Sequence, residues 1–252
     1  MKKTIRIMMS ALLMSSLIAC NHKAEETVEN PTSNKLQEME TSVTSILTAE
    51  EQANMTADEI IERLKKGNQN FVNNNLTTRD HSEQRRLAAI GQYPKAIVLS
   101  CVDSRVPVED VFDLGIGDIF VARVAGNIEN ADIVGSMEFA TAVAGSKVIV
   151  VMGHTSCGAV HHAIDNTDAA GLGMVNLQNL LNEIRPVLDA HKNVVHSSKN
   201  TEFANMIIDE NVAKTVADIK EVSPTLNKMH DDRKIKIIGA VYNMETGKVV
   251  FK

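Results

Sequence analysis

Two short clusters of metal-binding and charged side chains stand out in the sequence. Cys101, Asp103 and Arg105 directly follow one apolar run, and His154 and Cys157 follow another. Two cysteines and one histidine form a ligand set that catalytic zinc sites use, because three protein ligands leave a fourth position for water or substrate. The spacing therefore indicates a zinc site, provided that the fold brings the two clusters together.

The charged pair beside Cys101 suggests how such a site is controlled. Asp103 lies near enough to Cys101 to compete for the fourth position on the metal, and Arg105 lies two residues further on. In a salt bridge with Arg105, Asp103 can accept a hydrogen bond from a water or hydroxide on the metal and orient it. Once released, it can ligate the metal and close the site. We therefore expect Asp103 and Arg105 to be catalytic, with Asp103 a metal ligand only in a closed state.

Simpler interpretations of the two cysteines stay open. Buried cysteines at strand ends are often inert packing residues. In an exported protein Cys101 and Cys157 could instead form a disulfide, because the third cysteine, Cys20, has another expected role. Neither alternative requires an aspartate and an arginine at these positions, so the metal interpretation is favoured.

The segments around the clusters predict an α/β fold, with a doubly wound, mostly parallel sheet and a hairpin at one edge. Unbroken apolar runs such as 96–100 and 148–152 are typical of strands buried on both faces of a parallel sheet. Ligands of such sheets bind beyond the carboxyl ends of the strands, so we expect the two clusters to meet there. Strands are expected at 96–100, 119–124, 148–152, 235–242 and 248–251, and helices at 56–67, 108–114, 132–144, 159–165, 176–190 and 201–222.

The N-terminal region predicts export and a lipid anchor. Residues 1–19 have the positive start and short apolar stretch of a signal peptide, and they end in Leu17-Ile18-Ala19-Cys20, which resembles a bacterial lipobox. Cys20 is then the lipidation site, and the lipid is the only expected contact with a membrane, on its periplasmic side. An ordinary signal peptide that happens to end near a cysteine is the alternative. Residues 20–55 are expected to form an acidic polar tether, and residues 56–252 a single domain.

The charge of the chain excludes one class of partner. Its formal net charge is -6, whereas nucleic-acid binding needs a basic face. We therefore expect no nucleic-acid partner.

Taken together, the two clusters, the segment Ala125-Gly126-Asn127 and the run 135–140 resemble the β-class carbonic anhydrases. The resemblance implies reversible hydration of carbon dioxide to bicarbonate, with one Zn²⁺ per chain bound by Cys101, His154 and Cys157. It also implies that Asp103 and Arg105 form a gating dyad. The family assembles as homodimers or multiples of dimers, with active sites at the subunit interface.

Three further positions are carried over from the same resemblance. Gln92 matches a glutamine that donates a hydrogen bond to substrate, and Phe120 and Phe139 match aromatic residues of the pocket, near which Val106 is also expected. Many members have tyrosine where this chain has Phe139. Members regulated by bicarbonate have the motif Trp-x-Gly before the first cysteine ligand, and this chain lacks that motif. Arg123 does match an arginine of the family's bicarbonate site. The missing motif favours the constitutively open subgroup.

Two alternatives in function remain at this stage. The same metal chemistry would serve a hydrolase of carbonyl sulfide or carbon disulfide, and a zinc-binding or redox lipoprotein without turnover would need only the ligands. His161 and His162 follow Cys157 and could carry protons to solvent, although two ordinary histidines on a helix face explain them more simply.

Overall fold

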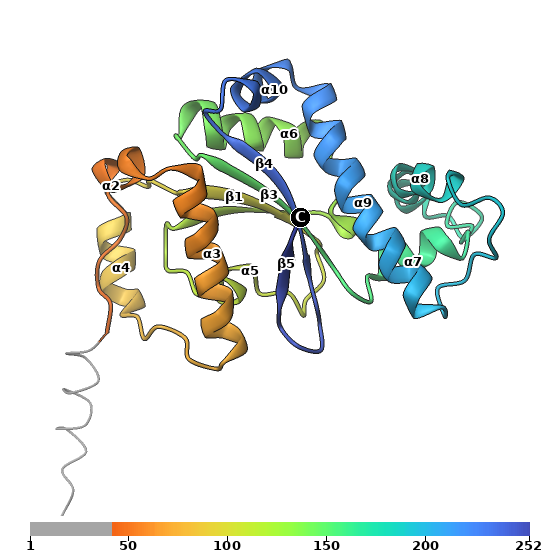
Figure 1. Ribbon diagram of the computed structural model, residues 1–252, viewed down its shortest axis with the longest axis horizontal. Helices are drawn as coiled ribbons and strands as arrows, with labels where there is room; N and C mark the ends of the chain where they lie inside the picture. The colour runs from red at the N-terminus through yellow and green to blue at the C-terminus, as the bar shows by residue number, and fades with distance from the viewer. Residues whose placement is uncertain (1–41) are drawn as a thin grey trace, which may run out of the picture. The chain divides into compact units, whose positions relative to one another are not determined.

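The structure, a computed structural model, describes residues 42–252 and has a five-stranded sheet at its centre (Figure 1). The strands are β1 (Ala96–Ser100), β2 (Ile119–Arg123), β3 (Val148–His154), β4 (Lys236–Tyr242) and β5 (Val249–Phe251). Their order is β2-β1-β3-β4-β5; the first four are parallel, and β5 pairs antiparallel with β4. The predicted parallel sheet with an edge hairpin is therefore confirmed.

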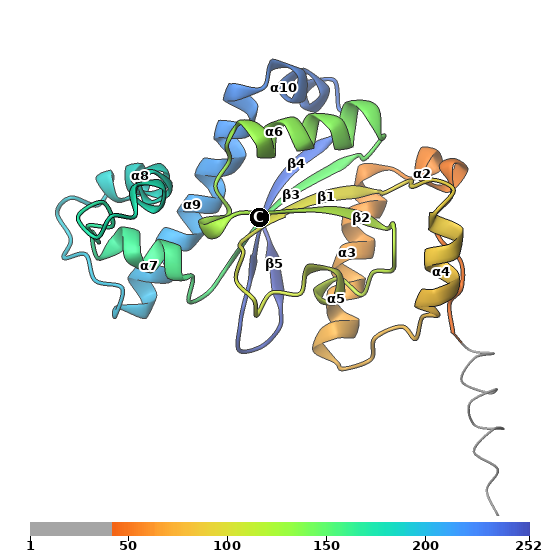
Figure 2. The ribbon, with the colours of Figure 1, turned by 180° about the vertical axis from the view of Figure 1, so that it is seen from behind.

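Helices cover both faces of this sheet, as Figures 1 and 2 show from opposite sides. The helices before β2 are α2 (Ala49–Asn54), α3 (Ala57–Val72), α4 (His81–Ala88) and α5 (Val108–Val111). Those after it are α6 (Ala131–Glu138), α7 (Gly158–Ile164), α8 (Val175–Asp189), α9 (Thr201–Val222) and α10 (Pro224–Asp231), with a 3₁₀ turn, η1 (Ala125–Asn127), and a π turn, η2 (Phe139–Val143). No helix among residues 42–252 is long and apolar enough to cross a membrane.

The buried side chains form one core on each face, because successive residues of a strand point to opposite sides. Ala96 and Val98 of β1 pack with residues of α3 and α5, whereas Ile97 and Leu99 pack with α6, α8 and α9. Every residue of β1 and β3 is buried. The two clusters therefore lie at the carboxyl ends of the two central, fully buried strands.

The first predicted helix begins where expected but ends later. Thr56 caps α3, and Glu59 completes the capping box. The helix does not stop at Gly67, because this glycine serves a close contact. A Cβ atom there would lie 1.9 Å from the carbonyl oxygen of Phe112. The glycine therefore lets α3 approach the segment that follows α5, and the helix continues to Val72.

The domain also begins before residue 56, so the expected tether boundary at residue 55 is wrong. Leu47 and Met55 are buried, and Gln52 donates hydrogen bonds to the carbonyl oxygens of Pro94 and Ala144, both at 2.8 Å. These contacts place the end of the polar segment against the sheet. The predicted signal peptide, Cys20 and the tether up to residue 41 lie outside the described residues.

Candidate metal centre

The three predicted metal ligands lie together at the carboxyl ends of the two central strands. Cys101 directly follows β1, His154 ends β3, and Cys157 precedes α7. Strands β1 and β3 are parallel neighbours, so both loops leave the sheet at the same edge. The ligand atoms of the three residues lie within 4.8 Å of one another, and all three side chains are buried. The expected meeting of the two clusters is thus confirmed.

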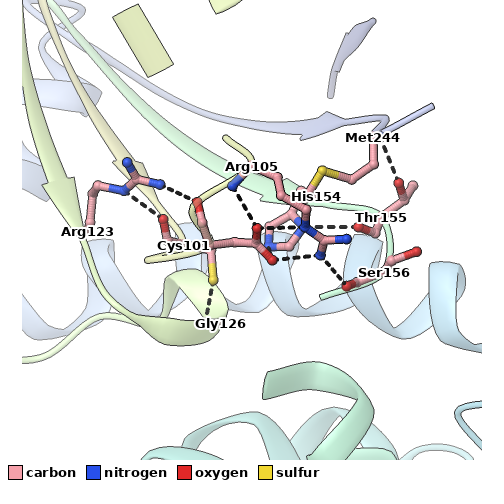
Figure 3. Close-up of polar contacts among 9 residues, drawn as sticks. Cys101, Arg105, Arg123, Gly126, His154, Thr155, Ser156 and Met244 are labelled. Atoms are coloured by element: carbon pink, nitrogen blue, oxygen red, sulfur yellow. Dashed lines mark hydrogen bonds and ion pairs between the residues drawn. The ribbon is translucent and has the colours of Figure 1, made fainter. Parts of the chain in front are cut away.

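The imidazole of His154 has one nitrogen free to bind a metal. Its Nδ1 lies 2.9 Å from the carbonyl oxygen of Thr155 and donates to it, so Nε2 carries the lone pair (Figure 3). Nε2 is buried without a hydrogen-bond partner, which is costly for a polar atom unless a ligand binds it. The orphaned nitrogen and the two nearby sulfurs therefore fit Zn²⁺, which prefers this set of donors.

The two cysteines are free thiols, and their sulfurs interact closely. The hydrogen bond from Cys157 is the main cause that lowers the pKa of Cys101 to about 4, and the backbone N–H of Gly126 adds to it. The Cys101 sulfur and burial raise the pKa of Cys157. The two sulfurs are thus close enough for one divalent cation to bind both in place of their protons.

Gly126 contacts the Cys101 sulfur through its backbone. Its N–H donates to Sγ at 3.4 Å, and its φ of +70° is one that glycine adopts readily. A Cβ atom would lie 2.7 Å from Cδ1 of Ile184, so a side chain here would displace the end of the Ile184 side chain. The glycine in the Ala-Gly-Asn segment therefore supports a metal ligand directly.

Asp103 and Arg105 form the predicted salt bridge. Nε and Nη2 of Arg105 donate to the two carboxylate oxygens of Asp103 at 2.9 and 2.7 Å, and the backbone N–H of Arg105 adds a third bond at 3.0 Å. These donors lower the pKa of Asp103 to about 2. Arg105 also reaches the carbonyl oxygen of Ser156 at 3.3 Å, which joins the two ligand-bearing loops.

Thr155 is a supporting residue that the sequence did not reveal. Its N–H donates to the carbonyl oxygen of Tyr242 at 3.0 Å. Its Oγ1 accepts from the N–H of Met244, also at 3.0 Å (Figure 3). These bonds tie the loop that carries His154 and Cys157 to the β4–β5 hairpin. A threonine beside a histidine has no distinctive pattern in a sequence, so only the fold identifies it.

The three predicted pocket residues lie away from the metal ligands of the same chain. Phe120 and Phe139 meet edge to face, with ring centroids 6.0 Å apart, and line a cavity of about 680 Å³ that includes none of the three ligands. Gln92 is exposed and precedes β1, whereas Cys101 follows it. At about 3.3 Å per residue, the five residues of β1 alone separate these positions by about 16 Å.

Two further expectations about the pocket have different outcomes. Val106 does not join the two phenylalanines, because it is buried in the core on the α3 and α5 face, whereas Phe120 packs against the opposite core. His162 is exposed and lies 3.0 Å, by its Nδ1, from Oγ1 of Thr167. His161 is half-buried, and burial lowers its pKa. A proton-carrying role for either histidine stays a prediction.

Comparison with known proteins agrees with this geometry. The family model described as "Carbonic anhydrase" matches residues 96–249. Carbonic anhydrase 2 of Mycobacterium tuberculosis is 32% identical over 191 residues, which cover 75% of this chain and 89% of that protein. The carbonic anhydrase of Mycolicibacterium smegmatis is 32% identical over 188 residues, covering 74% and 88%.

A solved structure gives the same result. The β-carbonic anhydrase CafA of the fungal pathogen Aspergillus fumigatus superposes with a TM-score of 0.59 at 28% identity, covering 68% of this chain and 81% of that one. The resemblance inferred from the sequence is thus confirmed by sequence and by fold. The chain belongs to the β class of the carbonic anhydrase family, enzymes that reversibly hydrate carbon dioxide to bicarbonate.

Proposed function

We propose that this chain hydrates carbon dioxide at one zinc ion held by Cys101, His154 and Cys157. The observation that carries the proposal is the buried convergence of two sulfurs and the unpartnered Nε2 of His154 beside a carboxylate. When bound, zinc acidifies water so that a nucleophile is available near neutral pH. The protein's own side chains bind and orient the reacting groups.

Asp103 is the residue that we expect to position the reacting oxygen. Both of its carboxylate oxygens accept hydrogen bonds from Arg105, so the group is ionised and acts only as an acceptor. It lies beside His154, with 3.9 Å between Oδ2 and Nε2. An acceptor fixed there can take a hydrogen bond from a water or hydroxide and fix which lone pair faces the substrate. The Arg105 contact corresponds to the open state of the gate.

We also propose that the active site is completed by a second copy of the chain. Gln92 and Phe139 are exposed, and Phe120 pairs with Ile97 near the start of β1, so none of the three reaches the metal centre of its own chain. If they contact substrate as the resemblance implies, they do so across an interface. Phe139 is half-exposed, so its ring can be reached by a partner. The expected assembly is a homodimer or a multiple of it.

The direct test is a stopped-flow assay of carbon dioxide hydration by the purified protein, with and without a zinc chelator. We expect rapid hydration that the chelator abolishes and that added zinc restores. Carbonyl sulfide and carbon disulfide are assayed in parallel, because the same donors could serve their hydrolysis. Faster turnover of either sulfur compound would reassign the substrate, and zinc binding without any turnover would leave a storage or redox protein.

The cellular location is a separate part of the proposal. The lipobox ending at Cys20 supports export and lipid attachment, with the domain facing the periplasm. Cys20→Ala should prevent acylation and release the protein from the membrane fraction. Incorporation of labelled palmitate into the variant at the wild-type level would refute the lipobox interpretation.

A further inference from the structure

Asp103 is held from two sides by two arginines that contact different parts of it. Arg105 binds the carboxylate, whereas Arg123 binds the main chain. Nε of Arg123 donates to the carbonyl oxygen of Cys101 at 2.9 Å, and Nη2 donates to the carbonyl oxygen of Asp103 at 2.6 Å (Figure 3). A single guanidinium thus bridges the metal ligand and the gating residue through their backbones.

The fold explains why Arg123 can make both bonds. Arg123 ends β2 and is paired in register with Ser100, the residue that ends β1. Its side chain therefore lies alongside the loop that leaves β1. A guanidinium carries donors in a rigid planar fork, so it can bind two carbonyl groups at once, which the point charge of a lysine does less well.

Asp103 is also held by hydrogen bonds within its own turn. The carbonyl oxygen of Asp103 accepts a second bond from the N–H of Val106 at 3.2 Å, which closes a tight turn. The Asp103 carboxylate accepts from the N–H of Arg105 inside that turn. Among the described residues, Arg123 forms no salt bridge with a carboxylate, and two of its donors are occupied by these carbonyl groups. Arg123 is therefore part of the loop's support.

We propose that Arg123 is a positioning residue that keeps the loop from Cys101 to Asp103 in the shape in which Asp103 faces Arg105. This inference rests on the proposed function. In the present loop the Asp103 carboxylate faces Arg105 and stays 3.9 Å from Nε2 of His154, and a movement of its backbone toward His154 would lengthen the bond from Arg123. Arg123 therefore stabilises the open state through the main chain, while Arg105 stabilises it through the side chain.

The test uses the full chain loaded with zinc and compares Arg123→Ala and Arg123→Lys with Arg86→Ala. Arg86 is a matched control, because its ion pair is with Glu83 on the exposed surface of α4. Two quantities are measured: carbon dioxide hydration, and the rate of zinc release to a chromophoric chelator. Circular dichroism checks that each variant is folded.

For Arg123→Ala we expect hydration to fall about 10–100-fold, as is common when support of a metal ligand is lost. Zinc release should become several-fold slower, because the freed Asp103 supplies a fourth protein ligand. The double variant Arg123→Ala with Asp103→Ala should lose this slowing and release zinc at the rate of Asp103→Ala alone. Arg123→Lys should fall between wild type and Arg123→Ala, and Arg86→Ala should match wild type in both measurements.

Zinc release from Arg123→Ala that is faster than from wild type would overturn the inference. A residue with a merely structural role would loosen the site, so zinc would leave Arg123→Ala faster. Unchanged hydration in a folded Arg123→Ala variant would also overturn it. Failure of the proposed function is recognised separately, because the wild-type protein would then bind zinc without hydrating carbon dioxide.

Discussion

Oδ2 of Asp103 lies 3.9 Å from Nε2 of His154 while its carboxylate is bound to Arg105. Two ligand atoms of a tetrahedral zinc ion, with bonds of about 2.0–2.1 Å, lie about 3.3 Å apart. The gating carboxylate is thus only about 0.6 Å further from the histidine than a bound ligand would be. Asp103 therefore lies close to the metal-binding nitrogen of His154 while it is held by Arg105, so we expect changes in the support of its loop to affect activity.

Loss of either member of the gating pair, Asp103 or Arg105, should lower the hydration rate without lowering the zinc content. We expect Asp103→Ala and Arg105→Ala each to lose at least about 100-fold in hydration rate, because the positioned acceptor is absent or displaced. Both should keep about one zinc per chain, measured by atomic absorption. If Asp103→Ala loses its zinc stoichiometrically, Asp103 is an ordinary fourth ligand and the gating account is wrong.

Replacement of a metal ligand should behave differently. Cys157→Ser should lose both zinc and activity, because two strong donors and a serine hydroxyl do not hold the ion. Cys20→Ser is the matched control, since Cys20 is the one cysteine outside the metal centre, and this variant should retain zinc. Full zinc occupancy and wild-type activity in Cys157→Ser would exclude the proposed ligand set.

Thr155 links the loop that carries His154 and Cys157 to the β4–β5 hairpin, and this link can be tested by substitution. Thr155→Val removes the acceptor for the N–H of Met244 with almost no change in shape. We expect zinc affinity, measured by competition with a chelator, to fall about 10-fold, the lower end of such effects. Thr141→Val is the control, because Oγ1 of Thr141 bonds only to carbonyl groups of its own helical segment, those of Met137 and Glu138. Equal affinities in the two variants would show that the hairpin does not support the site.

The buried ion pair between Arg79 and Asp113 predicts a pH-dependent contribution to stability. Burial acts to raise the pKa of Asp113, but hydrogen bonds from Asn70, Arg79 and Thr77 outweigh it, and the pKa is lowered. The pair therefore stabilises the fold above the ordinary aspartate pKa of about 3.9, and this stability is lost as pH falls through the lower pKa of the folded state.

The measurement compares chemical unfolding of wild type and Asp113→Asn between pH 7 and pH 3. At pH 7 the variant should be less stable by about 2 kcal/mol, because charge-assisted bonds are replaced by neutral ones. The difference should shrink below about pH 4. A difference that stays constant down to pH 3 would contradict the assigned shift.

The closeness of Cys101 and Cys157 predicts sensitivity to oxidation when the metal is removed. Their sulfurs lie within 4.8 Å, and Sγ atoms this close can form a disulfide after a modest adjustment. We expect the zinc-loaded enzyme to keep its thiols in mild oxidant, and the chelator-treated enzyme to lose two thiols and to need a reductant before zinc restores activity. Recovery without a reductant would show that the two sulfurs had not bonded.

The features that the sequence revealed are those that depend on local pattern. Unbroken apolar runs identified β1 and β3, and the residues just after them are the metal ligands, because parallel strands end at one edge. The capping box at Thr56 located the start of α3, and residues 201–222 were predicted as a helix with the bounds of α9.

Contacts between distant segments could not be predicted in this way. Gly67 looked like a helix end, whereas it permits contact with Phe112, 45 residues later. Helices α4 and α10 have only eight residues each and are mostly polar, so their pattern did not distinguish them from loops. Arg123 was recognised by its position alone, and its bonds to Cys101 and Asp103 depend on the register of β2 against β1.

The anchor of the metal loop on the hairpin has a consequence for biosynthesis. Thr155 and Met244 are separated by 89 residues, so the ribosome makes all three metal ligands well before the group that steadies their loop. At about 5–20 residues per second, the delay is about 4–18 s. During that time the nascent chain carries Cys101 and Cys157 without the complete frame that gathers them. The complete frame of the site therefore exists only after the C-terminal hairpin has been made.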